Sequence, residues 1–92
     1  MPLAIHPGRI LRREMTARKL SANRLALELG VPSGRVTDIV NGKRGITADT
    51  ALRLGRRLGT SAQFWMNLQT RHDLIVAEEK LGRRLVTEVR AA

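Results

Sequence analysis

The chain has 92 residues and no cysteine, and its 17 lysines and arginines against 8 aspartates and glutamates give a formal net charge of +9. This length suffices for one small domain and is too short for two, and without cysteine neither a disulfide framework nor a thiolate metal site can form. The chain does not begin with the basic and apolar regions of a secretory signal, and no apolar run approaches the ~20 residues that span a bilayer. We therefore expect one domain over residues 1–92, cytoplasmic and without a membrane partner.

The first predicted helix begins at Pro7, because proline suits the first turn of a helix, and runs to about Lys19. The apolar residues of this segment fall on one side, which we expect to face inward: Ile10, Leu11 and Met15. The opposite side is basic and should face outward, with Arg9, Arg12, Arg13 and Arg18.

Two short helices joined by a tight turn are predicted over about residues 21–41. Ser21 is a good N-cap, and Gly30 supplies the left-handed position that ends the first of them. The second runs from about Ser33 to Asn41, with Val36, Ile39 and Val40 on one side and small or polar residues on the other. A helix-turn-helix needs this arrangement, since one face packs on its neighbour and the other enters a DNA groove.

A basic loop over 41–45 should lead to a fourth helix, which Thr47 caps and Gly59 ends. A fifth helix should start at Thr60 or Ser61 and end near Leu81 or Gly82. Residues 83–92 could form a short helix, a strand contributed to a partner, or a frayed tail. The fold class is therefore all-α, a five-helix bundle that contains a helix-turn-helix and carries a C-terminal helix and tail over 61–92.

The positive charge is concentrated in the N-terminal part of the chain. Residues 1–60 hold twelve basic and four acidic side chains, a net charge of +8, whereas residues 61–92 hold five and four, a net charge of +1. A basic portion around a helix-turn-helix favours binding of a polyanion, and the nearly neutral part is left for protein contacts. A generally basic, solvated surface is the alternative interpretation of the charge alone.

Four residues of the second short helix are candidates for reading DNA bases. Ser33 and Thr37 lie one turn apart on the exposed face and can bond base edges, and Thr37 also offers a methyl group to thymine. Gly34 costs the helix about 1 kcal/mol relative to alanine, which close approach to the groove wall would offset. Asp38 could accept a hydrogen bond from cytosine, but we expect it to pair with Arg35, three residues earlier.

Phosphate contacts are predicted from the basic residues and helix ends that flank this face. The candidates are Lys43 and Arg44 in the following loop, Arg35 beside the helix, and Arg24 with the N–H groups behind Ser21. Asn41, which precedes a glycine, is interpreted as a helix end and not as a base contact. Three further arginines are expected to face solvent or a partner: Arg53, Arg56 and Arg57.

Enzyme chemistry is not indicated by any group of residues in the chain. His6 and His72 have no carboxylate or second histidine four residues further on, and no nucleophile with a base or Gly-rich phosphate loop can be assembled. We therefore expect neither an enzyme nor a cofactor or metal. The only aromatic residues besides histidine, Phe64 and Trp65, are predicted to be the main packing residues of the core, with part of their surface in a dimer or partner interface.

Two motifs resemble the helix-turn-helix antitoxins of the HigA type, within the Xre and phage Cro/repressor group: NGKRGITADTALRL after the second short helix, and FWMNLQ followed by a spacer and DL. The resemblance covers residues 6–79 and implies a lambda-repressor-like fold. It also implies a nucleoid-associated antitoxin that binds its own operator as a dimer and neutralises a small toxin, usually an mRNA interferase of the RelE type. A free-standing Xre-type repressor without a toxin, and a helical module that binds an acidic protein, remain the alternatives.

The C-terminal part is the predicted location of the dimer and toxin interfaces. Its apolar residues are available for self-association, namely Leu68, Ile75, Val76, Leu81, Leu85 and Val89. A toxin of this type is expected to be basic, and its binding site is therefore assigned to the acidic residues Asp73, Glu78, Glu79 and Glu88.

Overall fold

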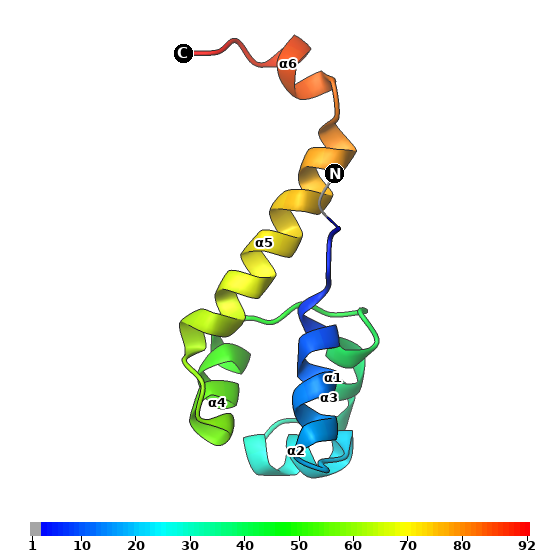
Figure 1. The fold of residues 1–92 in the computed structure, drawn as a ribbon, viewed down its shortest axis with the longest axis vertical. Helices are drawn as coiled ribbons and strands as arrows, with labels where there is room; N and C mark the ends of the chain where they lie inside the picture. Colours follow the sequence, from blue (N-terminus) through cyan, green and yellow to red (C-terminus); the bar gives the residue numbers. More distant parts are fainter. Residues whose placement is uncertain (1–2) are drawn as a thin grey trace.

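The computed structural model describes residues 3–92, and the regular structure in this range is entirely helical. The helices are α1 (Pro7–Ala17), α2 (Ala22–Leu29), α3 (Ser33–Val40), α4 (Ala48–Leu58), α5 (Ala62–Leu81) and α6 (Arg84–Glu88). The predicted all-α class is confirmed, and the five predicted helices are present. Of the three alternatives for the residues after Gly82, the short helix is the one observed. Figure 1 shows α1–α4 gathered at one end of the molecule and α5 extending away from them to α6.

The ends of the helices follow the capping residues that the sequence provides. The hydroxyl oxygens of Ser21 and Ser61 accept hydrogen bonds at 3.0 Å from backbone N–H groups three residues on, and that of Thr47 does so at 3.3 Å. Gly30 and Gly59 end α2 and α4 with φ of +73° and +77°, a conformation that glycine adopts without steric cost. These boundaries were predicted; α1, however, ends at Ala17, two residues before the predicted end.

We call α1–α4 together with the first half of α5 the body of the molecule. Its core is aliphatic and surrounds one indole ring. Trp65 is fully buried, and its Nε1 donates a hydrogen bond to the Thr60 hydroxyl at 2.8 Å. The prediction that Phe64 shares this core is wrong, because Phe64 is 39% exposed; its ring stands nearly perpendicular to the indole, with 5.1 Å between centroids. Consecutive helical residues point about 100° apart, and Phe64 lies on the side of α5 that is turned away from the core. The other buried core residues are Leu11, Met15, Leu25, Ala26, Leu29, Val36, Ile39, Ile46, Ala51, Leu54 and Leu58.

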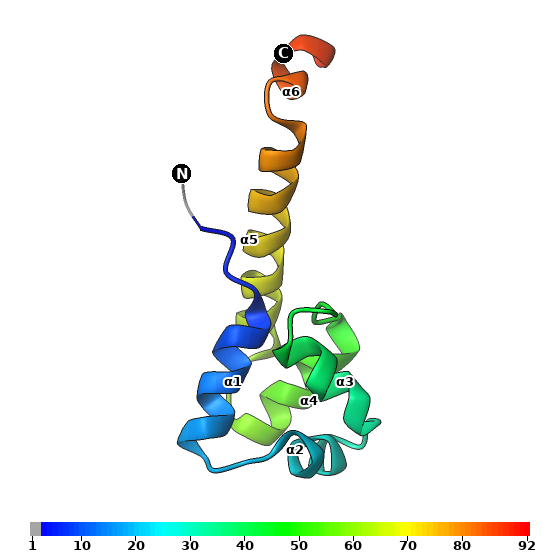
Figure 2. The ribbon, with the colours of Figure 1, turned by 90° about the vertical axis from the view of Figure 1, so that its right-hand side faces the viewer.

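The second half of α5 projects beyond the body, as Figure 2 shows, and gives the molecule an extent of 48 × 22 × 22 Å. All residues from Val76 to the C-terminus are exposed. Their apolar side chains include Leu81, Leu85 and Val89, which the sequence analysis assigned to an interface. No helix within residues 3–92 is long and apolar enough to cross a membrane.

The position of α3 depends on a close approach to α1. Gly8, in the first turn of α1, packs against the carbonyl group of Ile39, near the end of α3. A Cβ atom at this position would overlap the carbonyl oxygen, so the two helices can cross at this distance only because residue 8 has no side chain. This contact places the last turn of α3 beside the beginning of α1.

We expect Gly8→Ala to lower the free energy of unfolding by about 1–3 kcal/mol, because the obstacle is backbone and cannot rotate away. Urea unfolding followed by circular dichroism measures this loss. Gly34→Ala is the matched control: a Cβ there would meet no atom within 4 Å, and alanine favours the helix by up to about 1 kcal/mol. Equal stability of the two variants would contradict the assigned role of Gly8.

Candidate nucleic-acid interface

The outer face of α3 carries only small side chains. Ser33, Gly34 and Thr37 are exposed, whereas Val36 and Ile39 on the opposite face are buried in the core. The Thr37 hydroxyl donates to the Ser33 carbonyl oxygen at 3.3 Å, which leaves its oxygen free to accept and its methyl group exposed. The space over Gly34 is open. This face can therefore approach a flat or concave polar surface closely, as the predicted base-reading role requires.

Asp38 and Arg35 do not pair with each other as predicted. Asp38 instead pairs with Arg44, with 3.5 Å between Oδ2 and Nη2, and Arg35 pairs with Asp49, with 3.4 Å between Nη1 and Oδ1. The reason is tertiary: the loop after α3 folds back so that the Lys43 N–H donates to the Asp38 carbonyl oxygen at 2.8 Å, which brings Arg44 beside the Asp38 carboxylate. Asp38 therefore orients a basic loop residue and not Arg35.

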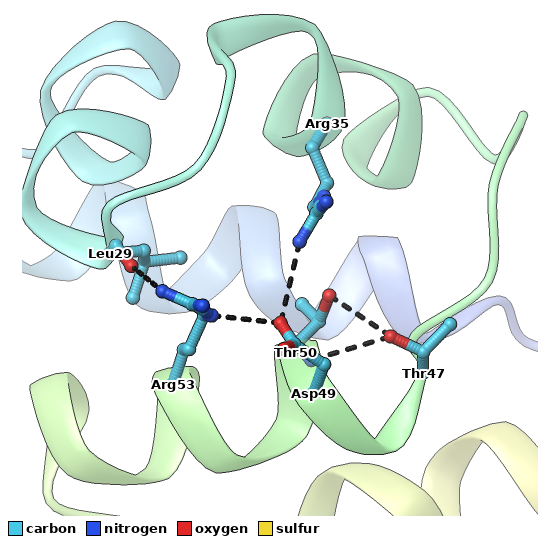
Figure 3. A network of polar contacts seen from close by, with 6 residues as sticks. All are labelled: Leu29, Arg35, Thr47, Asp49, Thr50 and Arg53. Atoms are coloured by element: carbon cyan, nitrogen blue, oxygen red, sulfur yellow. Dashed lines mark hydrogen bonds and ion pairs between the residues drawn. The ribbon is translucent and has the colours of Figure 1, made fainter.

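A polar network centred on Arg53 holds α3 on α4 (Figure 3). Arg53 donates from Nη1 to the Leu29 carbonyl oxygen at 2.9 Å and from Nε to Asp49 at 2.8 Å. Asp49 also receives the contact from Arg35, so one carboxylate joins the two arginines. The Leu29 carbonyl belongs to the last turn of α2, where carbonyl groups lack partners within the helix.

Arg53 is exposed, as predicted, and it also ties the end of α2 to α3 and α4. Its spacing of four residues from Asp49 was a signal for the ion pair. No sequence signal indicated the bond to Leu29, because that contact depends on how α4 crosses the end of α2. Arg57 is likewise engaged: it and Arg24 both bond Glu28 and lower the pKa of that carboxyl group from its ordinary value.

The predicted phosphate-binding residues lie around the outer face of α3. Ser21 and Arg24 mark the exposed N-terminus of α2, and Lys43 and Arg44 occupy the exposed loop after α3. Arg24 pairs with Glu28 at 2.7 Å, so its guanidinium is only partly available. Lys43 forms no ion pair with any carboxylate in residues 3–92. Arg35 is half-buried and faces α4, which makes it the least accessible of the five.

Two histidines that the sequence left without a role meet where α1 begins. His6 is the N-cap of α1, and its Nδ1 accepts a hydrogen bond from the Gly8 N–H at 2.9 Å. The His6 ring lies edge-on to that of His72 on α5, with 5.0 Å between centroids. Burial is the main cause that lowers the pKa of His6, followed by the nearby His72; Asp73 and the backbone of Arg44 oppose this shift. Among residues 3–92, no cluster of histidine and carboxylate groups could hold a metal ion.

A second network joins the loop after α3 to α5. Gln69 accepts a hydrogen bond from the Ile46 N–H at 2.7 Å and donates to Asp73 at 2.9 Å. Asp73, one of the predicted partner-binding residues, is thus engaged within the chain. Glu78, Glu79, Leu81 and Leu85 are exposed on the projecting segment, away from the face of α3. Two other residues predicted to be available for self-association are not: Ile75 is buried within the chain, and Leu68 is half-buried against the core.

Similar proteins are found both by comparison of sequences and by comparison of structures. The model of a helix-turn-helix family, HTH_3, matches residues 11–65. Virulence-associated protein I of Dichelobacter nodosus is 54% identical over 77 residues, which cover 83% of this chain and 71% of that protein. An addiction module antidote protein of the HigA family from Coxiella burnetii has a similar structure, with a TM-score of 0.94, 48% identity, and coverage of 99% of this chain and 100% of the other. The Pseudomonas aeruginosa antitoxin HigA, solved with the higBA promoter, gives a TM-score of 0.92 at 46% identity and covers 96% and 97%.

We expect stability to fall as the pH is lowered from 7 through 6.5, because the pKa of His6 is lower in the folded chain than its ordinary value of 6.5. The unfolded chain then binds the proton first, so the loss begins near pH 6.5 and is complete once the pH is below the folded pKa. A protonated Nδ1 also cannot accept from Gly8. Urea unfolding between pH 7.5 and 5.5 measures the slope. His6→Asn keeps a capping side chain without the titration and should flatten it; an unchanged slope would rule out His6 as its source.

Proposed function

This chain belongs to the helix-turn-helix family, and we propose that it is the DNA-binding antitoxin of a toxin–antitoxin pair and represses its own operon. The observation that carries the proposal is the outer face of α3, which is exposed, built of small side chains and bordered by basic residues. The full-length similarity to HigA-type antitoxins, one of them solved with its promoter, supports the same function.

In this proposal α3 enters the major groove of the operator. Ser33 and Thr37 bond base edges, and Gly34 lets the backbone approach the groove wall, where a side chain would hold it away. Asp38 can accept a hydrogen bond from a cytosine amino group only if Arg44, its ion-pair partner in the free chain, binds a phosphate of the duplex instead. Direct reading of the sequence by this short face is therefore sparse, and much of the affinity must come from the phosphates.

The phosphates are assigned to the groups that border α3. The N-terminus of α2, behind Ser21, offers backbone N–H groups, and Arg24 lies in the same turn. Lys43 and Arg44 reach the backbone from the loop at the other end of α3, and Arg35 contributes from its flank. Because Arg24, Arg35 and Arg44 each pair with a carboxylate in the free chain, Lys43 should make the least encumbered contact.

Operator binding in this proposal is by a two-fold dimer. One eight-residue recognition helix reads few base pairs, so two are needed, about 34 Å apart on a palindrome. The projecting half of α5 with α6 is the proposed dimer interface, since Leu81, Leu85 and Val89 are exposed there and a lone helical extension gains little stability in water. Two copies that pack these segments together would cover the apolar side chains.

The proposed partner in neutralisation is a small basic toxin of the RelE type. In this proposal neutralisation is stoichiometric binding that covers the toxin, since the sequence indicates no group of catalytic residues. Glu78 and Glu79 are exposed on α5 and form no ion pair within residues 3–92, so they are the acidic groups most available to a basic partner. Asp73 bonds Gln69 and Glu88 pairs with Arg84, which makes both less accessible than the sequence alone indicates.

For operator binding, we expect two classes of substitution to differ. Lys43→Ala should weaken binding to the operator and to a scrambled duplex equally, because a phosphate contact carries no sequence information. Ser33→Ala and Thr37→Ala should lower discrimination between the two duplexes, by about 1 kcal/mol or more for a good base contact. Fluorescence anisotropy titrations with both duplexes measure these effects. Identical behaviour of the two classes on every sequence would contradict the base-reading assignment.

The same titrations test the close approach of α3 and the dimer. Gly34→Ala, whose Cβ meets no atom of the chain, should keep the fold and weaken operator binding. A duplex with one half-site should bind far more weakly than a duplex with two, and sedimentation at micromolar concentration should show a dimer. A monomer that stays monomeric on the two-half-site duplex would sink the two-fold arrangement.

For antitoxin activity, we expect that expression of the neighbouring small gene alone arrests growth and that the intact chain restores it. Charge reversal in the double variant Glu78→Lys, Glu79→Lys should abolish this rescue while leaving operator binding intact. The variant Arg56→Glu reverses the charge of an exposed residue of α4, outside the projecting segment; it is the control and should still rescue. Full rescue by the lysine variant would refute the assignment, and a harmless neighbour would favour a free-standing repressor.

A further inference from the structure

The basic residues of the body divide into those that pair with carboxylates and those that do not. Six of the twelve in residues 1–60 form ion pairs: Arg18, Arg24, Arg35, Arg44, Arg53 and Arg57. Three of the remaining six lie on the outward face of α1, namely Arg9, Arg12 and Arg13, and no carboxylate within residues 3–92 pairs with them. The net positive charge of the body is therefore concentrated on α1 as much as on the helix-turn-helix.

The first turns of α1 are part of the same surface as the end of α3. Arg12 donates from Nη2 to the side-chain oxygen of Asn41 at 3.4 Å, and Asn41 is the residue that ends α3. Arg9 borders a shallow hollow of about 380 Å³ together with Val40, Asn41 and Gly42. The contact between Gly8 and the Ile39 carbonyl holds these residues together. Lys43 lies two residues after Asn41 in the chain. Arg9, Arg12 and Lys43 therefore form one basic edge, which extends from the loop after α3 to α1.

A duplex bound on the face of α3 would bring phosphates to this edge. The major groove is about 12 Å wide, so a helix lying in it has a phosphate row within about 6 Å of its axis on either side. Arg9 and Arg12 lie beside the last residues of α3, where one of these rows must pass. Guanidinium groups match phosphate oxygens in geometry and bind them in pairs of hydrogen bonds. An acidic protein could also meet this charge, but it would compete with the duplex for the edge that Lys43 shares.

We propose that Arg9 and Arg12 of α1 bind the DNA backbone beside the end of α3 and so extend the interface beyond the helix-turn-helix. This inference rests on the proposed operator binding. It adds two phosphate contacts for each copy of the chain, from a helix that the sequence analysis left out of the interface. Arg12 also positions Asn41 in the free chain, and it keeps a donor for a phosphate because its bond to the amide uses only one of its five N–H groups.

The test is the salt dependence of binding to a duplex from the region upstream of the gene and to a scrambled duplex. The variants are Arg9→Gln and Arg12→Gln, and the control is Arg56→Gln, which changes an exposed arginine of α4 beside Glu28 that pairs with no carboxylate among the described residues 3–92. The slope of log K against log salt is negative, and each lost phosphate contact reduces its magnitude by about 0.9, or by about 1.8 when both copies of a dimer lose it. We expect this reduction for Arg9→Gln and Arg12→Gln, equally on both duplexes, and an unchanged slope for Arg56→Gln.

Arg12→Lys separates a charge contact from a structural role, since lysine keeps the charge and should retain most of the slope. Thermal unfolding of each variant confirms that the fold is intact. Wild-type slopes for Arg9→Gln and Arg12→Gln, with operator binding by the unchanged chain, would overturn this inference alone. If the two variants keep wild-type slopes but no longer bind the neighbouring gene product, the basic edge binds that protein and not DNA. Failure of the unchanged chain to bind its upstream DNA would overturn the proposed function as well.

Discussion

The contact between Gly8 and the carbonyl group of Ile39 is the constraint from which the position of the recognition helix follows. It lets α1 cross the last turn of α3 at backbone distance, and no other residue could stand at position 8 without moving one of the two helices. The capping bond from Gly8 N–H to His6 starts α1 at the same point. The end of α3, the beginning of α1 and the basic loop after α3 are therefore held in one place.

The other end of the helix-turn-helix is held by a polar network in addition to the packing of buried side chains such as Leu29 and Val36. Arg53 bonds the last turn of α2 and shares Asp49 with Arg35, so α2, α3 and α4 meet at one carboxylate. Each of these groups is partly exposed, and each pair alone would contribute little stability. Together they restrain the turn between α2 and α3, which cannot open without breaking several of these hydrogen bonds. The base-reading face thus lies on a helix that is fixed at both ends.

The body and the projecting segment have different physical characters, which matches the division of labour that we propose. The body contains the aliphatic core and keeps a surplus of positive charge on the surface, as a DNA-binding unit requires. The segment after Ile75 buries nothing within the chain and exposes apolar and acidic residues together. One end of the molecule is thus suited to a polyanion and the other to protein partners, and α5 connects the two.

The sequence by itself determined the helices, their caps and the helix-turn-helix, because these depend on residues within one or two turns of each other. The helix caps act on the adjacent residues of the chain, as Ser21, Gly30, Thr47 and Gly59 do. The buried position of Trp65 follows from its apolar neighbours one turn away. The exposure of Phe64 did not follow, because which side of α5 faces the body depends on how α5 packs on α1 and α4. Only the tertiary structure decided the ion-pair partners of Asp38 and Arg35 and the bond from Arg53 to the Leu29 carbonyl, since these contacts join different helices or a helix and a loop. The meeting of His6 with His72, and of Arg12 with Asn41, was likewise decided by the crossing of helices that are far apart in the chain.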